Sequence, residues 1–279
     1  MDGAELKVDH VTVGGENLSR MRDALSSVGL ASAYGGPHAN RATEMAVLSF
    51  SDGSYLELIA AQSNADAEAL AAHYWAPFMK TRGTPCAWAV RVLDVSAEAR
   101  RLQAAGVQVT TPARSGRTRR DGIRLDWETA SVGPGSSGAF FPFLIRDFTP
   151  RDGRVYPTGK PTTTDFSGVA KVVVAVGNME KAVRLYRQAY GLAAPEVQRD
   201  PEFGAELAWF EGTPAMLASP LSSDSPLNSR LEKFGEAPYA FVLAGSSNKV
   251  RAGVHDSHWF GKPVTWFDEA RLGWRLGVE

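Results

Sequence analysis

The sequence has little cysteine, no excess of charge of either sign and no long apolar run. Cys86 is the single cysteine of 279 residues, which excludes an internal disulfide framework and a metal cage built from cysteines. Lys and Arg total 30 against 31 Asp and Glu, so the chain lacks the cationic excess of proteins that bind nucleic acid or anionic membranes. No run of about 18 apolar residues suits a transmembrane helix, and the first residues do not have a signal-peptide pattern. We expect a soluble, cytoplasmic protein with neither nucleic acid nor a membrane as partner.

Common catalytic motifs are absent as well. The chain has no Gly-x-Ser-x-Gly elbow, no phosphate-binding Gly-Lys-Ser/Thr loop and no dinucleotide fingerprint. The composition, 44% hydrophobic and 22% charged, is that of a folded chain, and its length is comfortable for two domains.

What is present is a repeated pattern of elements. Residues 8–13 alternate and read as a strand, residues 18–28 have helical spacing, and residues 45–50 and 55–60 read as two further strands. The same order returns from residue 87, from residue 169 and, more weakly, from residue 239. Four β-α-β-β-β units are therefore predicted.

The repeats predict an α+β fold with two domains. One β-α-β-β-β unit leaves a sheet face bare, so two units must pair to close a cup-shaped sheet. The segment before the third unit is rich in Pro, Thr and Gly and has no periodicity, as is typical of a linker. We predict domains at residues 1–150 and 167–279, joined by a linker at residues 151–166. Units that pair between chains would give a homodimer, and the sequence leaves this open.

The repeat resembles the vicinal oxygen chelate superfamily, which includes glyoxalases, extradiol dioxygenases and bleomycin-binding proteins. The N-terminal half is more similar to its glyoxalase-like domain, through residues 8–11, 35–38, 55–59, 119–127 and 141–147. Enzymes of this superfamily hold a divalent metal in the cup, with ligands from the first and last strands of each unit. The resemblance thus implies a small-molecule enzyme of the lyase, isomerase or dioxygenase type.

The matching ligand positions of the first unit are His10 and Glu57. Strand alternation agrees, because it aims both side chains into one concavity if the two strands pair. Imidazole and carboxylate both suit zinc, iron, manganese or nickel. His38, after Gly35 and Gly36, is the candidate for a third ligand. Glu57 is also the candidate for moving a proton.

Ligand types are missing from the other units. Other residues stand at the matching positions, namely Ala87 and Phe143 in unit two, Lys171 and Met216 or Leu217 in unit three, and Gly277 in unit four. The alternative is therefore a metal-free protein that binds a small molecule, such as an antibiotic or a metabolite. In that interpretation His10 is a hydrogen-bonded residue of the cup, His38 lies on the surface, and Glu57 pairs with an arginine.

Arginines and aromatic residues are the candidates for binding the substrate. Arg91 and Arg124 lie on predicted strands, and a guanidinium in the cup favours an anionic ligand. Arg114 and Arg117 are interpreted as part of a solvated loop. The predicted apolar walls are formed by Trp88, Trp127 and Phe143.

Overall fold

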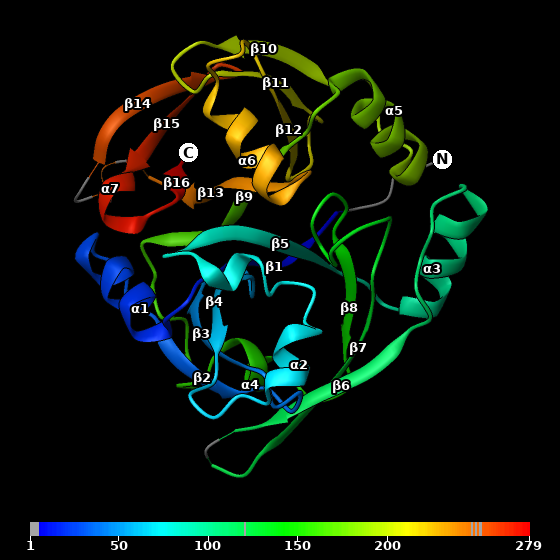
Figure 1. Ribbon diagram of the computed structural model, residues 1–279, viewed down its shortest axis with the longest axis vertical. Helices are drawn as coiled ribbons and strands as arrows, with labels where there is room; N and C mark the ends of the chain where they lie inside the picture. The colour runs from blue at the N-terminus through cyan, green and yellow to red at the C-terminus, as the bar shows by residue number, and fades with distance from the viewer. Residues whose placement is uncertain (1–5, 120, 247, 249, 251–252) are drawn as a thin grey trace.

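The computed structural model describes residues 6–119, 121–246, 248, 250 and 253–279, which form two curled β-sheets of eight strands each (Figure 1). The first sheet contains β1 (Val8–Gly14), β2 (Ala33–Pro37), β3 (Thr43–Ser49), β4 (Tyr55–Ala61), β5 (Thr84–Arg91), β6 (Ala113–Thr118), β7 (Arg124–Ala130) and β8 (Phe143–Asp147). The second contains β9 (Phe166–Ala175), β10 (Glu196–Asp200), β11 (Ala205–Trp209), β12 (Ala215–Pro220), β13 (Ala237–Gly245), β14 (Gly253–Trp259), β15 (Lys262–Phe267) and β16 (Arg275–Val278).

Helices of very different length join these strands. They are α1 (Leu18–Ser27), α2 (Ala67–Ala71), α3 (Val95–Ala104), α4 (Arg151–Val155), α5 (Met179–Tyr190), α6 (Pro226–Phe234) and α7 (Glu269–Leu272), with a short 3-10 helix η1 (Phe78–Lys80). The three helices that follow the first strand of a unit begin alike. Asn17, Asp94 and Asn178 each accept a hydrogen bond from the backbone N–H three residues later, which caps the helix. No helix among the described residues is long and apolar enough to cross a membrane.

The strand order confirms the predicted repeat. It is β2-β3-β4-β1-β5-β8-β7-β6 in the first sheet, and β10-β11-β12-β9-β13-β16-β15-β14 in the second. The first strand of each unit lies parallel to the last, as β1 does beside β4 and β5 beside β8. The fold is therefore α+β, with βαβββ units paired into two cups. The first sheet curls so far that its two edge strands, β2 and β6, come into contact.

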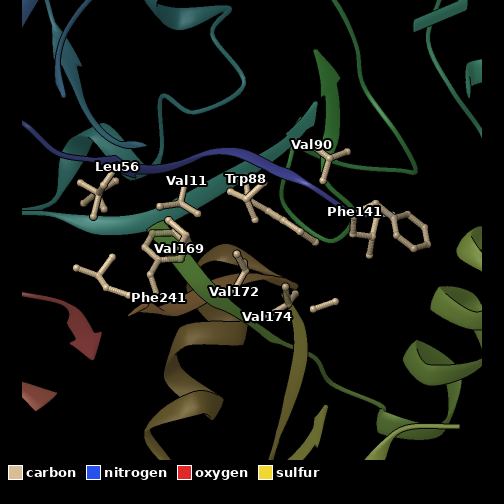
Figure 2. Packing of buried hydrophobic residues seen from close by; sticks show 14 of the residues in the cluster. Val11, Leu56, Trp88, Val90, Phe141, Val169, Val172, Val174 and Phe241 are labelled. Carbon is tan, nitrogen blue, oxygen red and sulfur yellow. The ribbon is translucent and has the colours of Figure 1, made fainter. Parts of the chain in front are cut away.

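The backs of the two cups pack against each other. Val11 on β1 and Trp88 on β5 face Val172 and Val174 on β9, and all four side chains belong to one buried cluster (Figure 2). Trp88 is fully buried there. Burying the β-branched and aromatic side chains of both sheets removes apolar surface from water, which is the main force that holds the two halves together.

The hollow of the second sheet is filled. A cluster of buried apolar side chains lies on its concave face, including Phe203, Trp259 and Trp266, and Leu227 of α6 packs against them. Lys171, at the position that matches His10, forms a buried ion pair with Glu279. The concave face of the second sheet is therefore covered by a packed apolar core, whereas that of the first sheet lines a cavity.

Some elements differ from the sequence prediction. Strands β6 and β10 were not expected, since both are rich in polar and charged residues. The segment expected to link the domains contains α4 and packs on the first sheet, where the backbone N–H of Ser49 donates to the Thr162 hydroxyl at 2.8 Å. In the fourth unit the four-residue α7 lies between β15 and β16 and not after the first strand β13; the segment after β13, residues 246–252, lies partly outside the described residues.

Candidate functional site

A cavity of about 350 Å³ opens in the concave face of the first sheet. Its wall includes alternate residues of four strands: His10 on β1, Tyr55, Glu57 and Ile59 on β4, Trp127 and Thr129 on β7, and Phe143 and Ile145 on β8. Because side chains of a strand alternate between the two faces, the residues between these point to the convex side. Alternation thus decides which side chains reach the cavity.

Glu57 lies at the centre of the polar part of the cavity. Thr12 is its register partner on β1, and the Thr12 hydroxyl donates to Oε2 of Glu57 at 3.1 Å. His10 Nε2 is 3.8 Å from Oε2, and His38 Nε2 is 3.6 Å from Oε1. Both distances exceed that of a hydrogen bond, so neither Nε2 is hydrogen-bonded to Glu57 and both are available to a ligand in the cavity. Glu57 is only 4% exposed, and its Oε1 accepts no hydrogen bond from the described residues.

Asp9 fixes the orientation of His10. Its Oδ1 lies 2.6 Å from Nδ1 of His10, and Asp9 is fully buried. Burial alone would raise the pKa of Asp9, but Arg154, the hydrogen bond with His10, and Arg151 outweigh it and hold the pKa well below its usual range. Asp9 is therefore ionised, and the proton between the two residues belongs to Nδ1 of His10. Nε2 is then the imidazole atom that faces the cavity.

Asp9 belongs to a network of two carboxylates and two arginines. Arg154 donates to Asp9 at 2.9 Å and 3.0 Å and to Asp147 at 2.5 Å and 2.8 Å, and Arg151 pairs with the same two carboxylates. Arg154 also donates to the Tyr55 hydroxyl at 2.6 Å. The Tyr55 ring stacks on the His10 ring, with the two centroids 4.7 Å apart. The imidazole is thus held on its edge by Asp9 and on its face by Tyr55.

His38 enters the cavity from the turn between β2 and β3. Its Nδ1 lies 2.8 Å from the Thr43 hydroxyl, and its backbone N–H donates to the Thr43 carbonyl. Burial lowers the pKa of His38, which Glu57 opposes and Arg117 reinforces. The ring is consequently neutral near pH 7, and Nε2 faces Glu57.

An aromatic segment borders the cavity between α2 and η1. His73, Tyr74 and Trp75 all line it, and Trp75 Nε1 donates to the Ser137 carbonyl at 2.9 Å. Burial lowers the pKa of His73 to about 4, with a smaller contribution from His38. His73 is therefore uncharged at neutral pH.

The loop whose Ser137 carbonyl accepts the hydrogen bond of Trp75 continues into Gly138, a position that only glycine fits. Gly138 has φ +73°, and a Cβ there would lie 2.7 Å from the Trp88 carbonyl oxygen and 2.9 Å from Cβ of Ala87. Gly135 in the same loop has φ +86° but nothing within 4 Å. We expect Gly138→Ala to lower the free energy of unfolding by more than about 1 kcal/mol, and by more than Gly135→Ala does. Urea unfolding of both variants measures the difference, and equal losses would contradict the packing described.

The donor types at Glu57 fit a divalent metal, but the structure does not assemble them. Two imidazole nitrogens and a carboxylate suit zinc or iron, and each histidine has its Nδ1 engaged and its Nε2 free, as metal-bound histidines do. However, among the residues that the structure describes, no group of three or more His, Cys, Asp or Glu side chains is arranged so that it could hold an ion. The predicted metal centre at His10, His38 and Glu57 remains a prediction.

Two of the five predicted substrate-binding residues line the cavity. These are Trp127 and Phe143. Arg124 is three residues from Trp127 on the same strand, so alternation places it on the opposite face, where it is exposed and pairs with Asp126 at 2.8 Å. Trp88 faces the second sheet for the same reason, because its neighbour Ala87 takes the concave side.

Arg91 is also not part of the cavity wall. It shares the parity of the concave face, but it is the last residue of β5, beyond the cavity. Its Nη2 donates to the Asp52 carbonyl at 3.2 Å, in the turn between β3 and β4. Neither Arg91 nor Arg124 forms an ion pair with Glu57, whose partners within 4.0 Å among the described residues are the two histidines.

The sequence interpretation missed two arginines of the site. Arg117 was assigned to a solvated loop, but it lies on β6, is 1% exposed and lines the cavity. Arg154 comes from the expected linker and also lines it. The polar and charged sequence of β6 gives no signal for Arg117, because only the structure shows the register that sets it opposite the buried Leu125. For Arg154 the sequence carries no periodic signal.

The fold and the site define a cup of the vicinal oxygen chelate type, and a family model agrees. Residues 8–168 match the model described as the glyoxalase-like domain, which covers more than half of the chain. The chain belongs to this glyoxalase-like family. No curated protein matches the sequence.

Solved structures share the fold at low sequence identity. A hypothetical protein from Staphylococcus aureus is 13% identical with a TM-score of 0.66, covering 98% of both chains. A mutant of 4-hydroxymandelate synthase from Streptomyces coelicolor is 11% identical with a TM-score of 0.63, covering 99% of this chain and 92% of the other. A methylmalonyl-CoA epimerase from Mycobacterium tuberculosis is 16% identical over 42% of this chain and 89% of its own, with a TM-score of 0.37. At these identities the first two similarities show the fold alone.

Proposed function

We propose that the first cup is the active site of an enzyme that moves a proton on a small substrate, with Glu57 as the group that takes and returns the proton. The observation that carries this proposal is the Glu57 carboxylate itself. It is buried at the wall of a cavity, and one of its oxygens is left without a hydrogen bond among the described residues. A general base must have such a free oxygen within reach of the substrate.

The histidines have supporting roles in this proposal. Nε2 of His10 and Nε2 of His38 both face the space next to Glu57, and Asp9 and Thr43 fix the two rings. A substrate placed there lies beside two imidazoles, with the carbon that loses its proton facing Glu57. Proton removal next to a carbonyl is the first step of many isomerisations and eliminations, so isomerase and lyase chemistry are the reaction classes we propose.

The form of this proposal that uses a metal has its own support. The separations of 3.6 Å and 3.8 Å are close to the roughly 3.5 Å between two ligands that each lie about 2.1 Å from one tetrahedral ion. His10, His38 and Glu57 would hold the ion after a small shift of their side chains. Bound there, a divalent ion would supply Lewis-acid polarisation of a substrate oxygen. Dioxygenase chemistry belongs to this second form.

Deuterium exchange tests the proposed reaction. The protein is incubated in D₂O with small ketones, aldehydes and 2-oxo acids, and proton NMR follows the hydrogens next to the carbonyl. We expect the protein to speed their exchange in at least one of these compounds beyond the rate in buffer. If none of them exchanges faster, the cup does not move a proton, and the metal-free binding protein becomes the better account.

Metal analysis decides between the two forms. The protein is purified without a histidine tag, and its transition metals are measured beside those of a His10→Ala, Glu57→Ala double variant. About one equivalent of a transition metal in the wild-type protein, and none in the double variant, supports the metal form. Exchange activity that persists without bound metal supports proton transfer by Glu57 alone.

A further inference from the structure

The charges around the first cup cancel except for two. Asp9 and Asp147 pair with Arg151 and Arg154, so this group of four is neutral as a whole. The donors of Arg154 are all used, because its five N–H groups make the five hydrogen bonds to Asp9, Asp147 and Tyr55. A ligand therefore cannot bind Arg154 without breaking this network. Outside it, the charged residues of the cavity wall are Glu57 and Arg117.

Arg117 is a buried cation without a carboxylate partner. Its Nη1 donates to the Gly35 carbonyl, and its Nη2 donates to the Arg154 carbonyl at 3.4 Å. Both acceptors are neutral, and no carboxylate of the described residues lies within 4.0 Å of the guanidinium. Three of its five N–H groups have no hydrogen-bond partner among the described residues. Glu57 interacts with this charge only across the cavity, and a buried charge without a hydrogen-bonded counter-charge is costly, so the guanidinium is available to pair with an anionic group of a ligand.

The closure of the sheet explains why Arg117 lies there. Arg117 is on edge strand β6, and its hydrogen bond to Gly35 reaches the opposite edge strand β2. Gly36, next to the acceptor carbonyl on β2, has φ +108°, a backbone conformation that favours glycine. The hydrogen bonds to the Gly35 and Arg154 carbonyls together use two N–H groups, but they do not neutralise the charge.

Arg230, also buried and without a carboxylate within 4.0 Å among the described residues, is in a different setting. Arg230 packs over the rings of Phe78 and Phe234, at 5.5 Å and 4.4 Å, and donates to two backbone carbonyls. It does not line the cavity of the cup. The aromatic faces partly compensate its charge. Arg117 differs because its guanidinium borders a space that a ligand can fill.

We propose that the substrate of the cup is a small carboxylic acid whose carboxylate pairs with Arg117 while its reacting carbon faces Glu57. The pairing of a carboxylate with Arg117 is independent of the proposed function, whereas the placement of the reacting carbon at Glu57 rests on it. Because Glu57 carries a negative charge in the same cavity, a monoanion that pairs with Arg117 leaves less excess negative charge than a dianion such as a phosphate would. The flat fork of a guanidinium also suits a carboxylate. Met45, Ile59, Phe143 and Trp75 supply apolar surface for the body of the acid.

The test compares an acid with its amide. Phenylacetate and phenylacetamide have nearly the same shape and differ in charge, and isothermal titration calorimetry measures both. We expect the wild-type protein to bind phenylacetate roughly tenfold or more tightly than the amide, as for a charged hydrogen bond in a buried site. Arg117→Met should lose this preference. Arg114→Met is the matched control, because Arg114 is exposed on the same strand and lies outside the cavity, and it should keep the preference.

Further variants keep the test decisive. If Arg117→Met does not fold, Arg117→Lys keeps the charge and should keep the preference for the acid. Benzylphosphonate, a dianion of similar shape at pH 8, should bind no more tightly than phenylacetate. A wild-type protein that does not distinguish acid from amide, an Arg117→Met protein that still does, or tighter binding of the phosphonate would each overturn the inference.

The outcome is separable from that of the proposed function. Glu57→Gln should retain the preference for phenylacetate, because the binding charge belongs to Arg117. If the preference is present but no deuterium exchange occurs with any compound, only the proton-transfer proposal fails. If exchange occurs but acid and amide bind equally, only the carboxylate inference fails.

Discussion

Glu57→Gln is expected to lower the rate of proton exchange in D₂O by about 10²–10⁴-fold, the usual contribution of a general base. The amide has the shape of the carboxylate and can still accept the hydrogen bond from Thr12, but it cannot take a proton. Fold and ligand binding should therefore be retained. Proton NMR of the exchanging compound gives the two rates directly.

Glu128→Gln is the control for this variant. Glu128 lies on β7 between Trp127 and Thr129, so it points to the face away from the cavity. The Glu128→Gln substitution removes one negative charge from the same sheet and should leave the exchange rate unchanged. Equal rates for Glu57→Gln and the wild-type protein would show that another group takes the proton.

Asp9→Asn is expected to lower the free energy of unfolding by about 3–5 kcal/mol at pH 7, the usual cost of removing one partner from a buried ion pair. Arg151 and Arg154 would each lose a charged partner, and His10 would lose the carboxylate that fixes its proton. Urea unfolding measures the loss. Asp152→Asn on the same helix as the two arginines is the control, since Asp152 is exposed and should change the value by less than about 0.5 kcal/mol.

The pH dependence follows from the same carboxylate. The pKa of Asp9 is well below its usual range in the folded protein, so folding favours the ionised form. Its contribution to stability is complete above the unfolded pKa of about 3.9 and is lost as the pH falls below that value towards the folded pKa. The wild-type protein should therefore lose stability below about pH 4 more steeply than Asp9→Asn does. Parallel curves for the two proteins would mean that Asp9 is not held ionised by its arginines.

The parts of the site that the sequence predicts are those set by strand alternation. The spacing within 8–13 and 55–60 places His10 and Glu57 on one face each, and the parallel pairing of β1 with β4 brings the faces together. The same rule, applied more strictly, would have separated Arg124 from Trp127, because residues three apart on a strand cannot share a face. The rule would also have placed Trp88 and its neighbour Ala87 on opposite faces of the sheet.

The parts that the sequence does not predict depend on tertiary closure. Arg154 reaches the cup because α4, in a stretch without periodicity, packs back on the first sheet. Arg117 is buried because the sheet curls until β2 meets β6, and no local pattern indicates the degree of curling. The filled second cup likewise follows from large side chains such as Trp259 and Trp266, which meet only after the strands have paired.

A crystal structure of Glu57→Gln with bound phenylacetate tests the central claim most directly. The account predicts the ligand in the first cup, with its carboxylate within hydrogen-bond distance of the Arg117 guanidinium and its methylene group facing residue 57, between His10 and His38. Phenylacetate bound outside the cavity at Arg91 or Arg124, with the cup left without it, would contradict the account.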